Sequence, residues 1–411
     1  MTREEADMWP LPSALLLSRY GPFAGPVALP LRPLTLLFGA NGTGKSALVR
    51  LPALLARASA ERFTGLAWRG TPGDESFEVG LRWPDEEIAE VRYQLDGGGY
   101  GQIPWLKGLT LRDAQGPRWE GAALRAGQPL APGPGHAPGE VACHGLLPAV
   151  APPHPAAALA ARLQDLQARV QFLSTVARLW EFVPHAAPPV DALRPDGANA
   201  AHFLAQRPAL REEVARFYAR LSPSLDLVFS EGCGYLLPTD KGPHACGHRL
   251  ELRRRACSER PVDLGDRGAG LCQVLPVLAG AAHAAHTSGG GLLAAERVEG
   301  NLHPNAQRVL ADFFCDLAAR PVPPTLVLET HSRVLLLSVQ LAVASGRLPR
   351  ERVALAWLGQ DKSGESHLTA VDLDERGQLG AGWPRTAFTT DLRLAQTLLQ
   401  MQWERDKTDA D

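Results

Sequence analysis

The segment Gly39–Ser46 has the residue types and the spacing needed to hold a triphosphate. It matches the pattern G-x-x-x-x-G-K-[ST] at every fixed position. Glycines let the backbone turn its N–H groups toward phosphate oxygens, and the positive N-terminus of a following helix adds to that attraction. Lys45 can then reach the β- and γ-phosphates, while the Ser46 hydroxyl can bind Mg²⁺. The residues expected to line this nucleoside triphosphate site are Asn41, Gly42, Thr43, Gly44, Lys45, Ser46 and Ala47.

The sequence on either side of this loop has the context that the motif requires. Leu34–Phe38 is a continuous apolar run, which predicts a buried strand. Ala47–Leu55 has apolar residues at helical spacing, so a helix is expected to begin at the loop. A glycine-rich turn without a ligand is the alternative, but Lys45 and Ser46 stand where a phosphate-binding loop needs them.

Two acidic residues follow another predicted strand, Gly291–Ala295, far along the chain. Ligands in open α/β sheets bind beyond the carboxyl ends of the strands. Glu296 is therefore suited to hold Mg²⁺ directly or through water, and Glu299 to orient or deprotonate an attacking water molecule. The alternative is an acid pair that only stabilises the start of the next helix.

Two further groups are candidates for contact with phosphate. His331 follows the predicted strand Thr325–Glu329 and can hydrogen-bond the γ-phosphate or the attacking water. A structural role is the alternative, but its order after the other two motifs favours function. The glycine-rich turn at Gly268 and Gly270 opens a helix and is a second place suited to anionic oxygen. This second turn suggests that two copies of the chain complete each other's site.

The elements that position these residues alternate between helix and strand from Val262 onward. Strands are expected at 291–295, 325–329 and 352–358, and helices at 270–286, 304–319 and 332–346. This alternation predicts a parallel sheet, covered on both faces, that also contains the strand before Gly39. Short alternating runs from Ala14 to Arg112, among them Leu66–Trp68, predict an antiparallel sheet beside the nucleotide site.

The middle of the chain differs in composition. Gly127–Pro155 is dense in Pro, Gly, Ala and His, which predicts a mobile surface insertion. Apolar periodicity predicts helices at Ala156–Phe182 and Ala201–Leu221, and the absence of sustained heptads favours a short helical lobe over a coiled-coil arm. The expected organisation is two halves of a nucleotide-binding domain, 1–115 and 231–411, separated by an insertion and helical lobe at 116–230.

The overall composition limits the choice of partners. The 411-residue chain has a formal charge of -2 and a pI near 6.6, so charge gives no general attraction to nucleic acid or anionic membranes. Arginines between Arg249 and Arg260 form a local basic cluster, for which a solvated strand edge is the simpler interpretation. No apolar run approaches membrane-spanning length, and Met1–Trp9 lacks a signal segment. A cytoplasmic protein without a membrane partner is predicted.

The six cysteines show no paired C-x-x-C spacing. His244, Cys246 and His248 alternate along one predicted strand, and Cys233 and Cys257 are near in sequence, so a zinc site is conceivable. Reduced cysteines are the simpler interpretation for a cytosolic chain.

Together these motifs resemble the ABC-like ATPases of the SMC and OLD group, in particular the stand-alone bacterial AAA-type members that lack long coiled coils. The resemblance covers most of Leu11–Trp68 and Val262–Leu399, whereas about Gly116–Arg255 matches only loosely, best at Asp196–Ala200. The segments that carry it most specifically are Pro33–Arg50, Asp263–Leu278, Ala294–Phe314 and Leu326–Leu337, with a further likeness in Ser363–Pro384.

The resemblance implies an α/β P-loop NTPase with an ABC-ATPase-like split nucleotide fold, an antiparallel β subdomain and a helical insertion lobe. It implies that ATP and Mg²⁺ are bound in a dimer or higher homo-oligomer. In that assembly Gly268–Gln273 of one copy would close the site around Lys45 and Ser46 of the other. Glu296 would be the Walker B acid, sharing the metal with Ser46, and His331 the switch histidine.

Two positions depart from the family pattern. Arg297 stands where relatives carry a catalytic Glu, or Gln in some, and an arginine cannot act as a general base at neutral pH. Either Glu299 takes that role, or hydrolysis is slow and ATP chiefly holds a dimer together. Cys272 stands where relatives often have Ser, which weakens a hydrogen-bond donor but leaves the backbone geometry available.

The leading interpretation is an ATP hydrolase that dimerises around Mg-ATP and gates a nuclease-like effector encoded nearby, in bacterial anti-phage defence. The partner and the setting come from the resemblance alone. One alternative is an ATP-locked scaffold with little hydrolysis, which Arg297 favours. Another is a DNA repair or chromosome-maintenance ATPase, which would bind nucleic acid in a salt-sensitive way. A P-loop kinase or GTPase is disfavoured because its metal acid usually lies nearer the phosphate loop.

Two lesser expectations concern aromatic and acidic residues. Tyr20 or Phe23 can stack on the adenine base. Asp372 and Asp374 have the D-x-D form of a Toprim nuclease, but too few residues follow His331 for that domain. A solvated strand end is the preferred interpretation.

Overall fold

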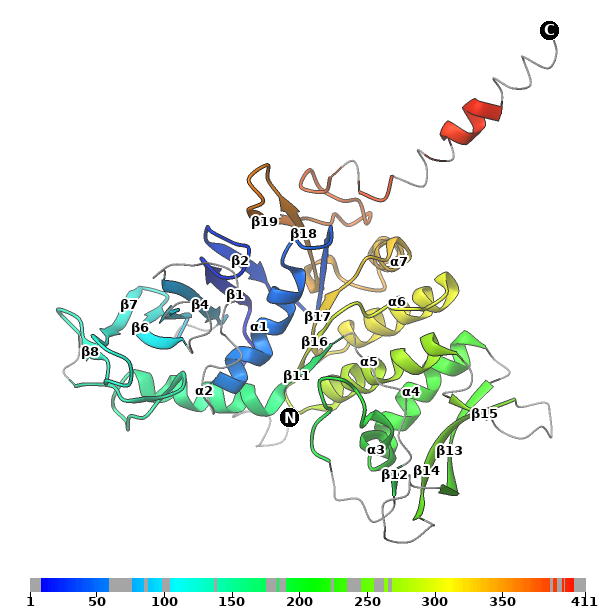
Figure 1. Ribbon diagram of the computed structural model, residues 1–411, viewed down its shortest axis with the longest axis horizontal. Helices are drawn as coiled ribbons and strands as arrows, with labels where there is room; N and C mark the ends of the chain where they lie inside the picture. Colours follow the sequence, from blue (N-terminus) through cyan, green and yellow to red (C-terminus); the bar gives the residue numbers. More distant parts are fainter. Residues whose placement is uncertain are drawn as a thin grey trace.

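The computed structural model describes residues 9–58, 76–84, 88–97, 104–136, 139–174, 183–184, 190–222, 225–234, 245–254, 262–264, 268–384, 387–389, 394 and 396–402. Its parallel sheet, antiparallel sheet and helical lobe are set side by side (Figure 1). This arrangement confirms the predicted α/β class with a split nucleotide fold. The strand predicted at Leu66–Trp68 lies outside the described residues.

The central sheet has six strands in the order β11-β16-β17-β3-β18-β19. The strands are β3 (Leu34–Gly39), β11 (Val170–Leu173), β16 (Leu292–Ala295), β17 (Thr325–Glu329), β18 (Val353–Gln360) and β19 (Ser366–Val371). All neighbours pair in parallel except β18 and β19. Strand β3 lies between β17 and β18. The strand that leads into the predicted phosphate-binding loop is therefore flanked on both sides by strands from the C-terminal part of the chain.

Helices cover both faces of this sheet, which explains why its strands are continuously apolar. On one face α1 (Lys45–Ala58) packs against β3, β11, β16 and β17. On the other, α5 (Ala269–His286) packs against β11 and β16, and α6 (Pro304–Ala318) against β3 and β17. Helix α7 (Arg333–Ala344) packs on α6, and a short 3-10 helix at Arg350–Arg352 leads into β18. All side chains of β3 are buried as a result.

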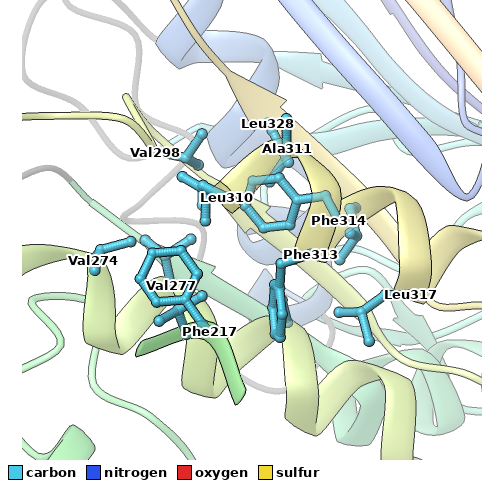
Figure 2. Packing of buried hydrophobic residues seen from close by; sticks show 14 of the residues in the cluster. Phe217, Val274, Val277, Val298, Leu310, Ala311, Phe313, Phe314, Leu317 and Leu328 are labelled. Carbon is cyan, nitrogen blue, oxygen red and sulfur yellow. The ribbon is translucent and has the colours of Figure 1, made fainter. Parts of the chain in front are cut away.

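Aromatic and aliphatic side chains fill the space between the α5–α6 face and the helical lobe. Figure 2 shows Phe217, Phe313 and Phe314 packed among side chains of the neighbouring helices. The rings of Phe217 and Phe313 meet edge to face, with centroids 6.4 Å apart. This packing fixes α6, and therefore the loop that precedes α6, against the sheet.

A seven-stranded antiparallel sheet, in the order β2-β1-β4-β5-β6-β7-β8, lies on the α1 side. Its strands are β1 (Ala14–Ser18), β2 (Val27–Pro30), β4 (Ser76–Arg82), β5 (Glu90–Asp96), β6 (Trp105–Asp113), β7 (Gly116–Ala122) and β8 (Ala131–Pro132). A second hydrophobic core joins this sheet to α1 and includes Leu37 and Leu48. The predicted antiparallel sheet beside the phosphate-binding loop is thus present.

Two helices predicted for the middle of the chain have different bounds in the structure. The helix expected at Ala156–Phe182 ends early: α2 spans Ala156–Arg169, and the following four residues form strand β11 at the edge of the parallel sheet. The helix expected at Ala201–Leu221 is broken before Pro208 into α3 (Ala200–Ala205) and α4 (Pro208–Leu221). Proline lacks the N–H that a continuous helix would need there.

The segment Gly127–Pro155, predicted to be a mobile surface insertion, is largely exposed in its described part, but it is anchored at several points. It contains β8 and the pair β9 (Cys143–His144) and β10 (Leu147–Pro148). Leu130, Val141 and Leu146 are buried in the second core, and Leu147 and Val150 pack against it partly buried. A handful of well-placed apolar side chains is enough to fix a segment that composition alone predicts to be mobile.

A small third sheet comprises β12 (Val183–Pro184), β13 (Leu225–Gly234), β14 (Ala245–Arg254) and β15 (Val262–Asp263). The backbones of Cys233 and Cys246 lie opposite each other in it, while His244 and Cys257 lie outside the described residues. The zinc hypothesis therefore stays a prediction. Among the helices of the described residues, none combines the length and the apolar character needed to cross a membrane.

Candidate functional site

The predicted phosphate-binding loop, Gly39–Ser46, joins β3 to α1. Gly42 and Gly44 have φ of +84° and +89°, a left-handed backbone that glycine adopts without strain. The Lys45 side chain is almost fully buried and folds back on the loop, where its Nζ donates to the carbonyls of Gly39 (3.0 Å) and Ala40 (2.7 Å). The first turn of α1 contains no acidic residue, so its N-terminus stays positive. The loop therefore presents a cation and a helix end to one place.

Three of the predicted site residues, Ser46, Glu299 and His331, lie close together at the carboxyl edge of the sheet. The backbone N–H of His331 donates to Oε1 of Glu299 over 2.6 Å. Among the described residues the other oxygen of Glu299, Oε2, is buried without a hydrogen-bond partner. His331 Nε2 lies 4.0 Å from Oε1 of Glu329, and Glu329 in turn accepts a hydrogen bond from the Ser46 hydroxyl at 2.8 Å. Ser46, Glu329, His331 and Glu299 therefore lie next to one another, with hydrogen bonds at the two ends and a 4.0 Å separation between Glu329 and the His331 ring.

Glu296, predicted to hold Mg²⁺ directly or through water, is paired with Arg50 in the structure. Its carboxylate is buried and accepts a hydrogen bond from Arg50 Nε at 2.6 Å, one turn along α1 from Ser46. The residue that contacts the Ser46 hydroxyl is Glu329, which sequence reasoning missed. Its sequence signal is a charged residue that ends an otherwise apolar strand, and the strand β17 lies next to β3.

The pKa shifts of Lys45 and His331 show which charged groups lie near these two residues. Burial lowers the pKa of Lys45; Arg297 lowers it further and Glu329 opposes the change. Burial also lowers the pKa of His331, assisted by the Lys45 and Arg297 cations and opposed by Glu299. The His331 imidazole is therefore neutral at pH 7, and Arg297 lies close enough to both groups to influence them.

Arg297 occupies a tight loop between β16 and α6. Arg297 and Asn301 both have left-handed backbones, with φ of +44° and +58°. Such conformations in residues other than glycine cost about 1–3 kcal/mol each and cluster at functional sites. The Arg297 side chain is exposed and lines a recess that also contains Glu296 and Gln273. The loop thus presents an exposed cation beside the buried carboxylate of Glu296.

The same loop holds the glycine-rich turn at the start of α5. Asn301 Nδ2 donates to Oε1 of Gln273 at 2.5 Å. A Cβ atom on Gly270 would lie 2.3 Å from the Asn301 carbonyl oxygen, so only glycine permits this approach. Gly268 has φ of +113° and is exposed. Of the predicted turn, 265–267 lie outside the described residues. Gly268 and Gly270 line a recess together with Asn301, Leu302 and His303.

Three lesser predictions have structural outcomes. Tyr20 and Phe23 are 7% and 1% exposed in the second core, so neither ring is presented for stacking on a base. Asp372 and Asp374 are exposed beyond the end of β19, as a solvated strand end requires. Within the described residues no group of three or more His, Cys, Asp or Glu is arranged to hold a metal ion.

The two loop glycines allow a matched test of the loop. Gly44→Ala is expected to lower stability more than Gly42→Ala, by about 1–3 kcal/mol. Both positions have left-handed backbones, but a Cβ at Gly44 would lie 2.6 Å from Pro22 and 2.8 Å from Phe23, whereas one at Gly42 meets nothing within 4 Å. Chemical denaturation of the two variants measures the difference, and equal losses would contradict the close packing described here.

Comparison with known proteins gives a likeness in structure but none in sequence. No protein-family model matches the chain, and no curated protein matches it. Similar solved structures include an SMC head bound to the C-winged helix domain of ScpA (13% identity, TM-score 0.49, 89% of this chain and 99% of that one). The SMC head domain from Thermotoga maritima is another (13%, 0.44, 89% and 100%). A third is an SMC head with an extended coiled coil bound to the C-terminal domain of ScpA from Pyrococcus furiosus (12%, 0.46, 88% and 96%).

Proposed function

We propose that the chain is an ATPase of the ABC and SMC type, which binds Mg-ATP at Gly39–Ser46 and hydrolyses it. The observation that carries this proposal is the meeting of Ser46, Glu329, His331 and Glu299 at one edge of the sheet, directly beside Lys45. A phosphate-binding loop accompanied by carboxylates and a neutral histidine has the groups that phosphoryl transfer to water needs. Asn41–Ala47 would enclose the phosphates.

Each group has a role that follows from its surroundings. Lys45 would leave the carbonyls of Gly39 and Ala40 to contact the β- and γ-phosphates. Glu299 has one oxygen fixed by the His331 N–H and a second, buried oxygen with its acceptor capacity unused in the described structure. That second oxygen would orient the attacking water and take its proton as the bond to the γ-phosphorus forms and the bond to the leaving oxygen breaks. The neutral His331 imidazole can hydrogen-bond the γ-phosphate.

Magnesium would be held by Ser46 and by carboxylate at the strand ends, where Glu296 and Glu329 are the candidates. Hydroxyl and carboxylate oxygens are the ligands that Mg²⁺ prefers, together with water and substrate phosphates. When bound, the ion would neutralise charge that develops on the phosphate oxygens.

A second copy of the chain would complete the site. Gly268 is exposed at the N-terminus of α5, an 18-residue helix whose positive end can meet anionic oxygen. Because Gly270 and Gln273 are held by Asn301, this turn is fixed to the loop that carries Glu299. The dimer around ATP would gate a nuclease-like effector in anti-phage defence, as the family resemblance suggests.

An ATP-locked scaffold is the second candidate, and the exposed cation of Arg297 favours it. A positive group beside the γ-phosphate stabilises bound ATP but cannot deprotonate water. The two candidates differ in turnover. With Mg-ATP in excess, the ATPase is expected to release many phosphates per protomer, which a coupled phosphate assay detects. Release that stops at one phosphate or fewer per protomer, while ATP stays bound, would establish the scaffold.

A further inference from the structure

Two carboxylates stand at the same level on neighbouring strands of the central sheet. Ala295 of β16 pairs with Leu328 of β17, so the next residues, Glu296 and Glu329, leave the sheet side by side. Glu329 is aligned with Leu37 of β3, which belongs to the core on the α1 side. Both acids therefore face α1.

Helix α1 contacts each acid with a different group. Ser46 and Arg50 are four residues apart, which places them on one face of the helix. Ser46 Oγ donates to Glu329 Oε2 at 2.8 Å, and Arg50 Nε donates to Glu296 Oε1 at 2.6 Å. The Ser46 hydroxyl, which is expected to bind magnesium, thus contacts Glu329, the acid on the strand next to β3. Glu296, on the strand beyond it, already has the Arg50 guanidinium as its partner.

The separation of the Ser46 and Glu329 oxygens fits one octahedral ion. Mg²⁺ binds oxygen at 2.0–2.1 Å, so two oxygens at adjacent octahedral positions lie about 2.9 Å apart. The 2.8 Å between Ser46 Oγ and Glu329 Oε2 is the length of an ordinary hydrogen bond and is also close to that edge. Neighbouring strands are about 4.8 Å apart, and β16 is one strand further from β3 than β17 is. Glu329 is consequently the acid whose oxygen already lies close enough to Ser46 for the two to share an ion once the hydroxyl proton turns away.

The ion-pair partners of the two acids also differ in a way that favours Glu329 as the metal ligand. The Glu329 side chain is 3% exposed, and its ion-pair partner in the described part of the chain is His331, at 4.0 Å. The cations of Lys45 and Arg50 also lie near enough to Glu329 to interact with it. The Glu296 side chain is 4% exposed and has a direct ion pair with Arg50 at 2.6 Å. Because direct pairing neutralises a buried carboxylate best, Glu329 is the acid that gains more from a bound cation.

We propose that Glu329 is the carboxylate that holds magnesium with Ser46, and that Arg50 keeps Glu296 out of the metal site. This inference rests on the proposed nucleotide site and deepens it. It moves the metal-holding carboxylate from the Walker B strand to the neighbouring strand, and it gives Glu296 a positioning role through Arg50.

The test measures binding of Mn²⁺, as a probe for Mg²⁺, to the full chain saturated with ADP, using the electron paramagnetic resonance signal of free Mn²⁺. Glu329→Gln is expected to weaken Mn²⁺ binding about tenfold or more, and Glu296→Gln by less than about threefold. The two variants are matched, because each replaces a carboxylate by an amide of the same shape. Combining Ser46→Ala with Glu329→Gln should weaken binding by less than the product of the single effects, because both residues would share one ion.

Fluorescent ADP binding in EDTA provides the control for folding and for the phosphate-binding loop, and both amide variants should bind like the wild type. A larger loss of Mn²⁺ affinity in Glu296→Gln, equal losses, or an unchanged affinity in Glu329→Gln would each overturn the inference while leaving the proposed function intact. Wild-type protein that binds no nucleotide, with or without Mn²⁺, would overturn the proposed function and the inference with it.

Discussion

Replacing Lys45 with alanine is expected to weaken ATP binding by about 100-fold or more, which corresponds to about 2.7 kcal/mol. The side chain is 4% exposed and ends beside the loop carbonyls, so its ammonium group would meet phosphate in a site shielded from water. Charge-assisted contacts in such a place are much stronger than those at the surface. Isothermal titration calorimetry with a non-hydrolysable ATP analogue and Mg²⁺ measures the change.

Lys107→Ala is the matched control, because Lys107 lies on β6 and its side chain is 42% exposed. It removes the same charge and should leave nucleotide affinity within about twofold of the wild type, since a distant exposed charge is screened by salt. If Lys45→Ala and Lys107→Ala bind ATP equally well, Gly39–Ser46 is not the nucleotide site.

The Glu299→Gln variant is expected to release phosphate at least about 100-fold more slowly than the wild type, with ATP binding retained. The amide keeps the shape of the side chain and can still accept the hydrogen bond from the His331 N–H. It cannot take a proton from water, because an amide is not a base at neutral pH. Single-turnover phosphate release measures the chemical step separately from binding.

Glu212→Gln provides the control for that substitution, since Glu212 is exposed on α4 and away from the sheet edge. It is expected to turn over like the wild type. Turnover that is unchanged in Glu299→Gln would show that another group activates the water, and the role assigned to Glu299 would be wrong.

Much of the nucleotide fold could be predicted because its elements have strong local signals. The strand Thr325–Glu329 has the predicted bounds, since a run of apolar residues ends at a charge and a helix cap follows at Ser332. The helix α5 begins one residue before its prediction, because glycines mark its start. The order of strands in the sheet depends on pairing between segments that are far apart in the sequence. The alternation of helix and strand predicts a parallel sheet but not that order.

One error arose where two structures have the same local pattern. Val170–Leu173 continues the apolar spacing of α2, and a short buried strand cannot be distinguished from a helix by periodicity alone. Tertiary contact decides the outcome, because these four residues complete the edge of the sheet beside β16.

Side-chain partners were the least predictable part of the site. The sequence identifies Ser46 and Glu296 as neighbours of the carboxyl edge, but not that Glu329, at the end of the next strand, meets the hydroxyl instead. That choice depends on Arg50, an exposed helix residue whose side chain reaches across to Glu296. No motif specifies this contact, so only the packing of α1 on the sheet reveals it.

The mass of the Glu299→Gln variant in solution tests the central claim most directly, because this variant should keep ATP bound. In light scattering coupled to size-exclusion chromatography, Mg-ATP is expected to convert the 44.1 kDa chain into a species of twice that mass or a higher multiple. ADP, or ATP with EDTA, should leave the mass lower. The same mass under all conditions, in a protein that calorimetry shows to be saturated with ATP, would contradict an assembly built around the nucleotide.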